Sequence, residues 1–188
     1  MSLKTTHQRA QISIVNNTGS KLISVGVAHK YSDVFKNDLQ WQNLNNGQSG
    51  NAQWVDHNTG TFTTGRDWWV VVFVDSNGHS YMTDPANFRA LFDAAEKALG
   101  PTLNALAPLA AAIATGDPEP TTKAVAIATA ATAAACSLLL NNEGTDGYKQ
   151  HILRDEDAGA VTRIVLTLSD VTFNSPSGTS TTGVRRIA

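Results

Sequence analysis

Residues 56–75 read DHNTGTFTTGRDWWVVVFVD, and this stretch decides how the rest of the chain is placed. Its second half, from Trp68 to Val74, is almost entirely β-branched or aromatic, which predicts a central strand buried on both faces. Its first half predicts a loop, in which Gly60 and Gly65 permit sharp backbone reversals. The loop also carries charged and amide side chains that a folded core does not need. We therefore expect any binding site to lie beside this loop.

The composition favours one domain. The chain has 188 residues, of which 41% are hydrophobic. This is enough for one domain with a well-buried core but is short for two domains. We expect a flexible N-terminal segment at residues 1–10 and a single domain over residues 11–188. Only 16% of residues are charged and the formal net charge is -2, so nucleic acid is disfavoured as a partner.

The cysteine content and the N-terminus limit the choices further. A single cysteine, Cys136, excludes an internal disulfide framework and a zinc site built from cysteines. It is expected to be a small buried hydrophobe. The first residues, MSLKTTHQRAQ, contain no apolar signal region, which predicts a cytoplasmic or unconventionally secreted protein.

Short alternating segments with turn signals between them predict a series of strands. Residues 11–15 and 21–28 are expected to form an opening hairpin through the turn NNTGS. The Asn-rich residues 36–51 predict a surface loop or an edge segment. Asp75-Ser76-Asn77-Gly78 predicts a hairpin turn after the central strand, in preference to a calcium loop. Further strands are expected at 52–55, 79–83, 148–153, 161–168 and 171–174.

Between residues 85 and 142 the apolar period changes from strand to helix. A helix from Pro85 to Leu99, a second over 102–114 and a third over about 122–140 are expected, and the last two are rich in alanine. The predicted fold is thus α+β and β-rich: an antiparallel β-sandwich with a three-helix, Ala-rich insertion at about 85–142.

No motif in the chain specifies a reaction. It lacks a G-x-S-x-G elbow, a Walker-type phosphate loop and a cysteine beside a histidine, so neither a catalytic residue nor a cofactor is assigned. The five histidines stand singly. His29, His57 and His151 lie in regions expected to converge, which keeps a metal-dependent or acid–base enzyme as an alternative. No metal ligand is assigned.

A ligand-binding site is easier to support. Aromatic side chains with neighbouring carboxylates and amides suit a glycan or another small polar ligand. The candidate ligand-binding residues are His29, Tyr31, Asp33, Asp56, Asn58, Arg66, Asp67 and Trp69. The structural alternative is that Trp69 fills the core and that the loop carboxylates only pair with Arg66.

A membrane is the competing partner. Residues 124–140 are apolar apart from Thr and Ser, slightly short of the ~20 residues that span a bilayer. With residues 102–115 they would form a helical hairpin over 101–140 that could act in a pore-forming or lipid-binding protein. The soluble alternative is a helical pair packed through small alanines.

Five motifs carry a resemblance to a known family. They are HKYSDVFKND (29–38), VDHNTGTFTTGRDWWVV (55–71), TDPANFR (83–89), GYKQHILRDED (147–157) and FNSPSGTSTTG (173–183). Together they resemble the up-regulated-in-Daf (UDP) domain of nematode and fungal proteins, with Thr83 where the family motif has serine. The resemblance spans Gln11 to Gly183 and implies one complete domain, but it brings no reaction, ligand or catalytic set. The family's association with stress and defence implies a ligand-binding or membrane-active effector rather than a metabolic enzyme. Of these we expect a non-enzymatic, lectin-like protein.

Overall fold

The structure is a computed structural model that describes residues 5–32, 35–60, 66–85, 93, 96–97, 122–141 and 144–187. Its strands are β1 (Thr6–Asn16), β2 (Leu22–Tyr31), β3 (Phe35–Leu44), β4 (Gln53–Thr59), β5 (Asp67–Asp75), β6 (Ser80–Thr83), β7 (Lys149–Gln150), β8 (Val161–Leu166), β9 (Asp170–Ser175) and β10 (Gly178–Arg186). The helix α2 (Thr122–Asn141) and a short 3-10 helix, η1 (Asp155–Asp157), complete the described elements.

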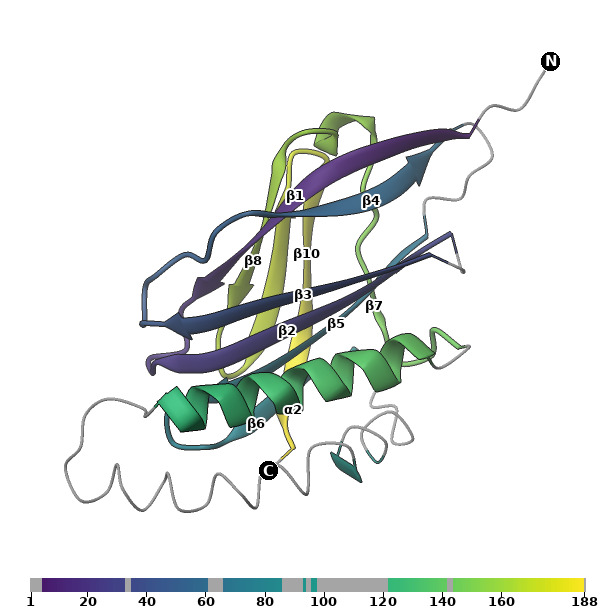
Figure 1. Cartoon of the computed structure of the whole chain (residues 1–188). Coiled ribbons are helices and arrows are strands. Elements are labelled where there is room, and N and C mark those ends of the chain that lie inside the picture. Colours follow the sequence, from purple (N-terminus) through teal and green to yellow (C-terminus); the bar gives the residue numbers. More distant parts are fainter. Residues whose placement is uncertain are drawn as a thin grey trace.

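The ten strands form one sheet that curls into a nearly closed barrel (Figure 1). Their order is β3-β2-β5-β6-β10-β9-β8-β1-β4, with β7 paired to β5 beside β6. Neighbours are antiparallel except β1 and β8, which are parallel. The two end strands, β3 and β4, are in contact, and side-chain hydrogen bonds join them.

The predicted sandwich is wrong, although the β-rich class is right. A sandwich needs two separate sheets, whereas the β6–β10 and β1–β8 pairings join all the strands into one. Alternation of buried and exposed residues is the same in a sandwich and in a barrel, so the sequence pattern does not separate them.

The strand β5 is buried on both faces, as its sequence predicts. Trp69, Val71 and Phe73 lie in the core inside the barrel, while Val70 and Val72 lie in a second apolar cluster beneath α2. The central run of the chain thus separates two apolar layers, which explains why it contains no alternating polar residues.

The third predicted helix is confirmed as α2, which lies across the outer face of β2 and β5 (Figure 1). Small residues allow the close approach: a Cβ added at Gly26 would lie 2.8 Å from Cys136 Sγ. Hydroxyls also join the layers, since Thr132 Oγ1 lies 2.6 Å from Ser24 Oγ. The other two predicted helices lie outside the described residues, apart from the helical positions 93, 96 and 97.

The predicted opening hairpin is wrong. β1 pairs with β4 and β8, and β2 pairs with β3 and β5, so the two strands lie on different sides of the barrel. The turn between them is a corner held by Asn16, whose Nδ2 donates to the carbonyls of Ser20 and Leu44, each at 2.8 Å. Asparagine and glycine suit such a corner as well as a hairpin.

Two boundaries also differ from the sequence pattern. β1 begins at Thr6 rather than Gln11. Residues 6–10 pair with the neighbouring strand β4 and do not form a free N-terminal segment. The Asn-rich residues 36–51 contain β3, so the edge-segment alternative is the correct one. The turn after β5 is confirmed, with the N–H groups of Asn77 and His79 both donating to Asp75 Oδ1 at 2.9 Å.

Candidate functional site

One end of the barrel interior is polar. It is the end where β2 and β4 finish and β5 and β10 begin. The rest of the interior is filled by apolar side chains such as Ile12, Val71 and Phe73. The buried histidines and carboxylates at this end are His29, His57, Asp67, His151 and Asp157.

The centre of this polar end is the pair of His29 and Asp67. Their side chains are 0% and 2% exposed, and His29 Nε2 lies 2.9 Å from Asp67 Oδ1. The second carboxylate oxygen of Asp67 accepts the N–H of Leu153 at 2.9 Å. Trp69 stacks on His29 with ring centroids 3.8 Å apart. Asp67 therefore ties β2 and β5 to the segment that follows β7.

A second carboxylate holds the segment around η1. Asp157 is fully buried, and it accepts the N–H of Arg154 at 2.7 Å and the hydroxyl of Ser177 at 2.6 Å. His57 lies nearby with Nε2 3.3 Å from the Arg154 carbonyl, while its Nδ1 has no hydrogen-bond partner among the described residues. Burial lowers the pKa of His57, so this ring is neutral near pH 7.

The three histidines expected to converge do lie at the same end of the barrel. His29 and His57 point into the interior. The ring of His151 stacks on the buried Phe173 ring, with the two ring centroids 5.3 Å apart. Within the described ranges, however, no three His, Cys, Asp or Glu side chains are grouped so that they could hold a metal ion.

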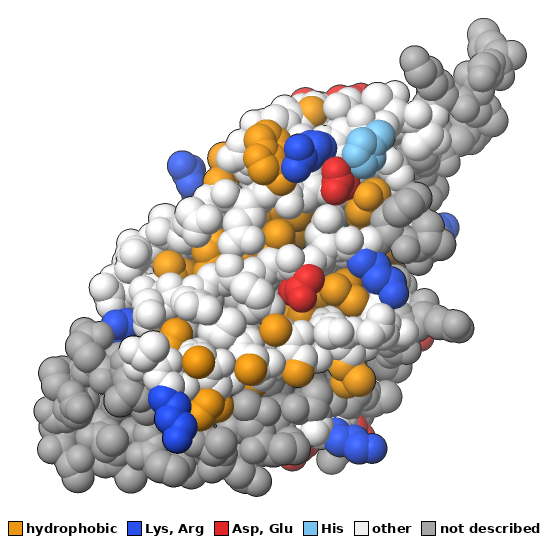
Figure 2. Space-filling view, viewed as in Figure 1, with side chains coloured by type: hydrophobic (Ala, Val, Ile, Leu, Met, Phe, Trp, Pro, Cys, Tyr) orange, Lys and Arg blue, Asp and Glu red, His pale blue; other side chains and the backbone are white. Residues whose placement is uncertain are grey.

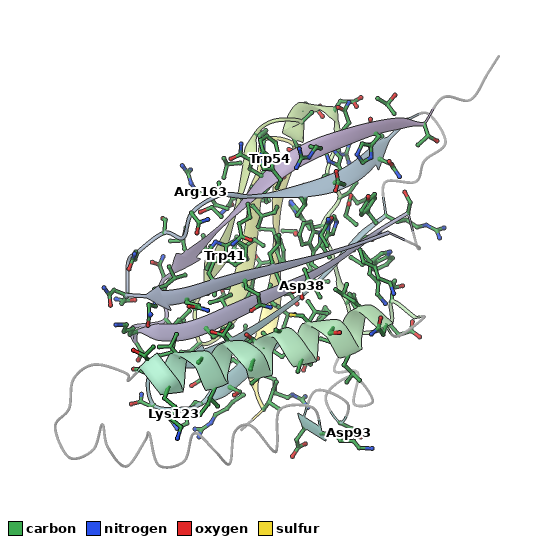
Figure 3. All side chains as sticks on the ribbon, viewed as in Figure 1. Asp38, Trp41, Trp54, Asp93, Lys123 and Arg163 are labelled. Carbon is green, nitrogen blue, oxygen red and sulfur yellow. The ribbon has the colours of Figure 1, made fainter. Side chains whose placement is uncertain are left out.

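The outer face of β1 and β4 presents a different group of side chains. Trp54, on β4, is 45% exposed, and the Arg9 guanidinium on β1 lies 4.8 Å from its ring centroid. Asp56, two residues along β4, lies 3.6 Å from Arg9 Nε and 3.1 Å from His7 Nε2 through Oδ1. Figure 2 shows hydrophobic, basic, acidic and histidine side chains adjoining over β1 and β4, and Figure 3 places Trp54 there.

A pocket of about 420 Å³ lies at the end of β4, next to this outer face. Asn58, the next outward residue of β4 after Asp56, lines it together with the η1 segment. The Asn58 side chain is oriented by a 2.8 Å hydrogen bond from Nδ2 to Ser32 Oγ. The lining residues are Asn58, Thr59, Gly60, Ile152, Leu153, Arg154, Asp155 and Glu156. We call the surface formed by His7, Arg9, Trp54, Asp56 and Asn58 the β4 strip.

The structure divides the candidate residues from the sequence into two groups. His29, Tyr31, Asp67 and Trp69 are buried at the polar end of the interior. Asp56 and Asn58 lie on the β4 strip, on the other side of the sheet. Arg66 is exposed just before β5, and Asp33 lies outside the described residues. The loop predicted in the first half of residues 56–75 is also shorter than expected, because β4 extends to Thr59 and β5 begins at Asp67.

Sequence reasoning missed the residues that β1 contributes. Arg9 lies opposite Asp56 and His7 opposite Asn58 in the β1–β4 pairing. The signal was present in the alternation of residues 6–12, THQRAQI, which continues the pattern of β1 toward the N-terminus. Trp54 shows the same alternation with Asp56 and Asn58.

These features define a class: a small, nearly closed β-barrel domain with an apolar helix on its outer face and a polar end. The profile of a family described as "Up-Regulated in long-lived daf-2" matches residues 6–184. The chain therefore belongs to this family, as its motifs indicate. No curated protein sequence matches the chain significantly.

Proposed function

We propose that the protein binds a glycan or another small polar ligand along the β4 strip. The observation that carries this proposal is the exposed Trp54 ring with Arg9 and Asp56 held beside it. An aromatic surface flanked by directional polar groups gives a ligand both apolar contact and oriented hydrogen bonds. Tryptophan is enriched in binding surfaces relative to the rest of a protein's surface.

The interior residues do not suit this role. His29, Asp67 and Trp69 are fully enclosed and already bonded to one another or to backbone groups. A ligand would have to displace these bonds and would leave buried polar groups unpaired, at a cost of about 1–3 kcal/mol for each group. These three side chains instead lie on the inner side of the sheet, opposite the β4 strip.

The strip has the dimensions of an extended ligand. Trp54 and Asn58 are four residues apart on one face of a strand, which corresponds to about 13 Å at the usual strand rise. The pocket of about 420 Å³ beyond Asn58 would take the end of such a ligand. Asp56, between them, provides an acceptor whose position is fixed by His7 and Arg9.

A glycan-array screen followed by titration of Trp fluorescence tests the proposal. Trp54→Ala and Asp56→Ala should each weaken binding about tenfold or more, which corresponds to about 1.4 kcal/mol. Leu168→Ala is the matched control, because Leu168 is 47% exposed in the turn between β8 and β9. Unchanged affinity in folded Trp54→Ala protein would exclude the β4 strip.

A second candidate function is membrane binding through α2. Within the described chain, α2 is a helix whose length and composition would allow it to cross a membrane, although half of it is buried against the barrel. The core helix of a soluble protein has the same properties. Detachment would expose the apolar outer face of β2 and β5 and break the Ser24–Thr132 contact.

A disulfide between α2 and β2 tests the membrane role. The Cβ of Gly26→Cys would lie 2.8 Å from Cys136 Sγ, close to the roughly 3 Å expected across a disulfide. If α2 inserts, the oxidised variant should not release dye from anionic liposomes, and reduction should restore release. Equal release with and without the disulfide would rule out detachment. Gly26→Ser is the matched control without a cross-link.

A further inference from the structure

A second pocket, of about 280 Å³, lies on the other side of the segment that follows β7. It is lined by Gln150, His151, Ile152, Arg154, Ser177, Gly178, Thr179 and Ser180. It shares Ile152 and Arg154 with the 420 Å³ pocket but no residue of the β4 strip. Its walls carry a histidine and several hydroxyl groups from the β9–β10 hairpin, which the proposed ligand binding does not use.

His151 is held rigidly in this wall. It is 6% exposed, its carbonyl accepts Trp69 Nε1 at 2.9 Å, and its N–H donates to the Asp67 carbonyl at 3.2 Å. Its imidazole lies between two serines: Nδ1 is 2.8 Å from Ser180 Oγ and Nε2 is 3.0 Å from Ser175 Oγ. Both ring nitrogens therefore have a hydroxyl partner.

One tautomer of His151 satisfies all of these contacts together with the neighbouring Gly178 carbonyl. Ser175 Oγ donates its proton to the Gly178 carbonyl at 3.0 Å. A hydroxyl has one proton, so in the tautomer that keeps this bond Ser175 accepts from the N–H at His151 Nε2. His151 Nδ1 is then unprotonated, and Ser180 donates its hydroxyl proton to it. This is the arrangement of a serine beside a general base that is oriented by a third group.

The protonation state agrees with this assignment. Burial lowers the pKa of His151, and Lys149 lowers it further, whereas the nearby Asp157 and Asp67 carboxylates raise it. The net direction is downward, so the ring is neutral at pH 7 and able to accept a proton.

We propose that Ser180 is a nucleophile, with His151 as its general base, for acyl transfer from a small carboxylic ester to water. Ser180 Oγ attacks the ester carbonyl carbon while its proton passes to His151 Nδ1. The bond from that carbon to the alcohol oxygen then breaks, and His151 returns the proton to the alcohol. Water attacks the acyl-serine with His151 again accepting a proton, which releases the carboxylic acid and restores Ser180. Water is the only co-reactant, and the overall change is ester hydrolysis.

The pocket fits a short polar ester better than a long apolar one. Most of its lining side chains are polar, and they include the exposed Arg154, whose guanidinium suits a carboxylate elsewhere on the substrate. The proposal does not rest on glycan binding by the β4 strip, since the two sites use different residues.

The test uses the full chain with p-nitrophenyl acetate, with peptide mapping by mass spectrometry. We expect acetylation of Ser180 and loss of that product in Ser180→Ala. His151→Gln should slow acetylation about 100-fold or more, the usual effect of a general base. Thr181→Ala is the matched control, because Thr181 is the next hydroxyl on β10 and pairs instead with Thr172 at 3.0 Å. Acetylation only at lysines or tyrosines, or an unchanged rate in Ser180→Ala, would overturn the proposal.

A pH profile of the unmodified chain covers the case in which His151→Gln fails to fold. With His151 as base, the acetylation rate of Ser180 should rise through one ionisation below the ordinary histidine value and then level off. A rate that rises steadily with hydroxide concentration would contradict the assigned role of His151.

Discussion

His29 and Asp67 face each other inside the barrel, with His29 Nε2 2.9 Å from Asp67 Oδ1 and both side chains almost completely buried. The pair joins β2 to β5, and the second oxygen of Asp67 extends the connection to Leu153. Trp69 covers the His29 ring. One carboxylate thus fixes three separate parts of the chain at the polar end.

We expect Asp67→Ala to lower the free energy of unfolding by about 2–5 kcal/mol, because His29 Nε2 and the Leu153 N–H would both lose their acceptor. Asp67→Asn retains an acceptor oxygen and should lose less. Urea unfolding measures the difference. Asp155→Ala, at an exposed carboxylate, is the control and should change stability by only about 0.5 kcal/mol. A loss no larger than that in Asp67→Ala would mean that the pair does not hold the barrel end.

The contact of Gly26 with α2 gives a second prediction. A methyl group at this position would lie 2.8 Å from Cys136 Sγ, 3.0 Å from Gln40 Nε2 and 3.3 Å from Thr132 Cβ. Gly26→Ala should therefore lower stability by about 1–3 kcal/mol through overpacking. Cys136→Ala removes the nearest atom, so the double variant should recover part of the loss. Equal effects in both backgrounds would show that α2 does not press on Gly26.

Stability should decrease as the pH falls below neutrality. Burial lowers the pKa of His57 and His151 below the ordinary value of 6.5, so the unfolded chain binds more protons than the folded one in this range. The stability from these groups is complete above the ordinary value and is lost as the pH falls toward the lowered values. Urea unfolding between about pH 7.5 and pH 5.5 should show the loss.

His57→Leu separates the His57 part of this effect. The variant should lose less stability on acidification than the parent chain does. Thr59→Val, at the next inward position of β4, is the control because it removes a buried hydroxyl without removing a titratable group. An acid dependence in His57→Leu that matches the parent chain would show that His57 is not kept neutral by the fold.

The sequence predicts the buried central strand β5 better than it predicts the strand pairings that close the barrel. The run from Trp68 to Val74 is apolar at every position, so burial on both faces follows from composition alone. His29 and Asp67 are both among the candidate ligand-binding residues, but their contact inside the barrel depends on the β2–β5 pairing, which the sequence pattern does not predict. The pairing of Arg9 with Asp56 does not follow, because it depends on a β1–β4 register set by the whole barrel. The turn NNTGS led to the wrong prediction of a hairpin, because its residues suit a corner as well as a hairpin.

Asn37 connects the interior to the β4 strip across the barrel seam, and this leads to the last prediction. Its Oδ1 accepts the Asp56 N–H at 3.2 Å and lies 3.2 Å from His29 Nδ1, while its Nδ2 is 3.5 Å from Asp56 Oδ2. This side chain takes the place of a backbone bond between β3 and β4. Asn37→Ala should therefore speed amide exchange at Asp56 about tenfold, the equivalent of one hydrogen bond of about 1.4 kcal/mol.

Hydrogen–deuterium exchange on peptides that cover residues 53–59 measures this change, and residues 161–166 of β8 provide an internal reference that should not change. Asn174→Ala is the matched control, because Asn174 is exposed and its side chain accepts a hydrogen bond from Thr179 at 3.0 Å. If the β4 strip binds a ligand, Asn37→Ala should also weaken that ligand by up to about tenfold, since Asp56 would lose part of its orientation. Exchange at Asp56 that is equally slow in Asn37→Ala would show that the seam is held by other contacts, and Asn37 would then have no part in positioning the strip.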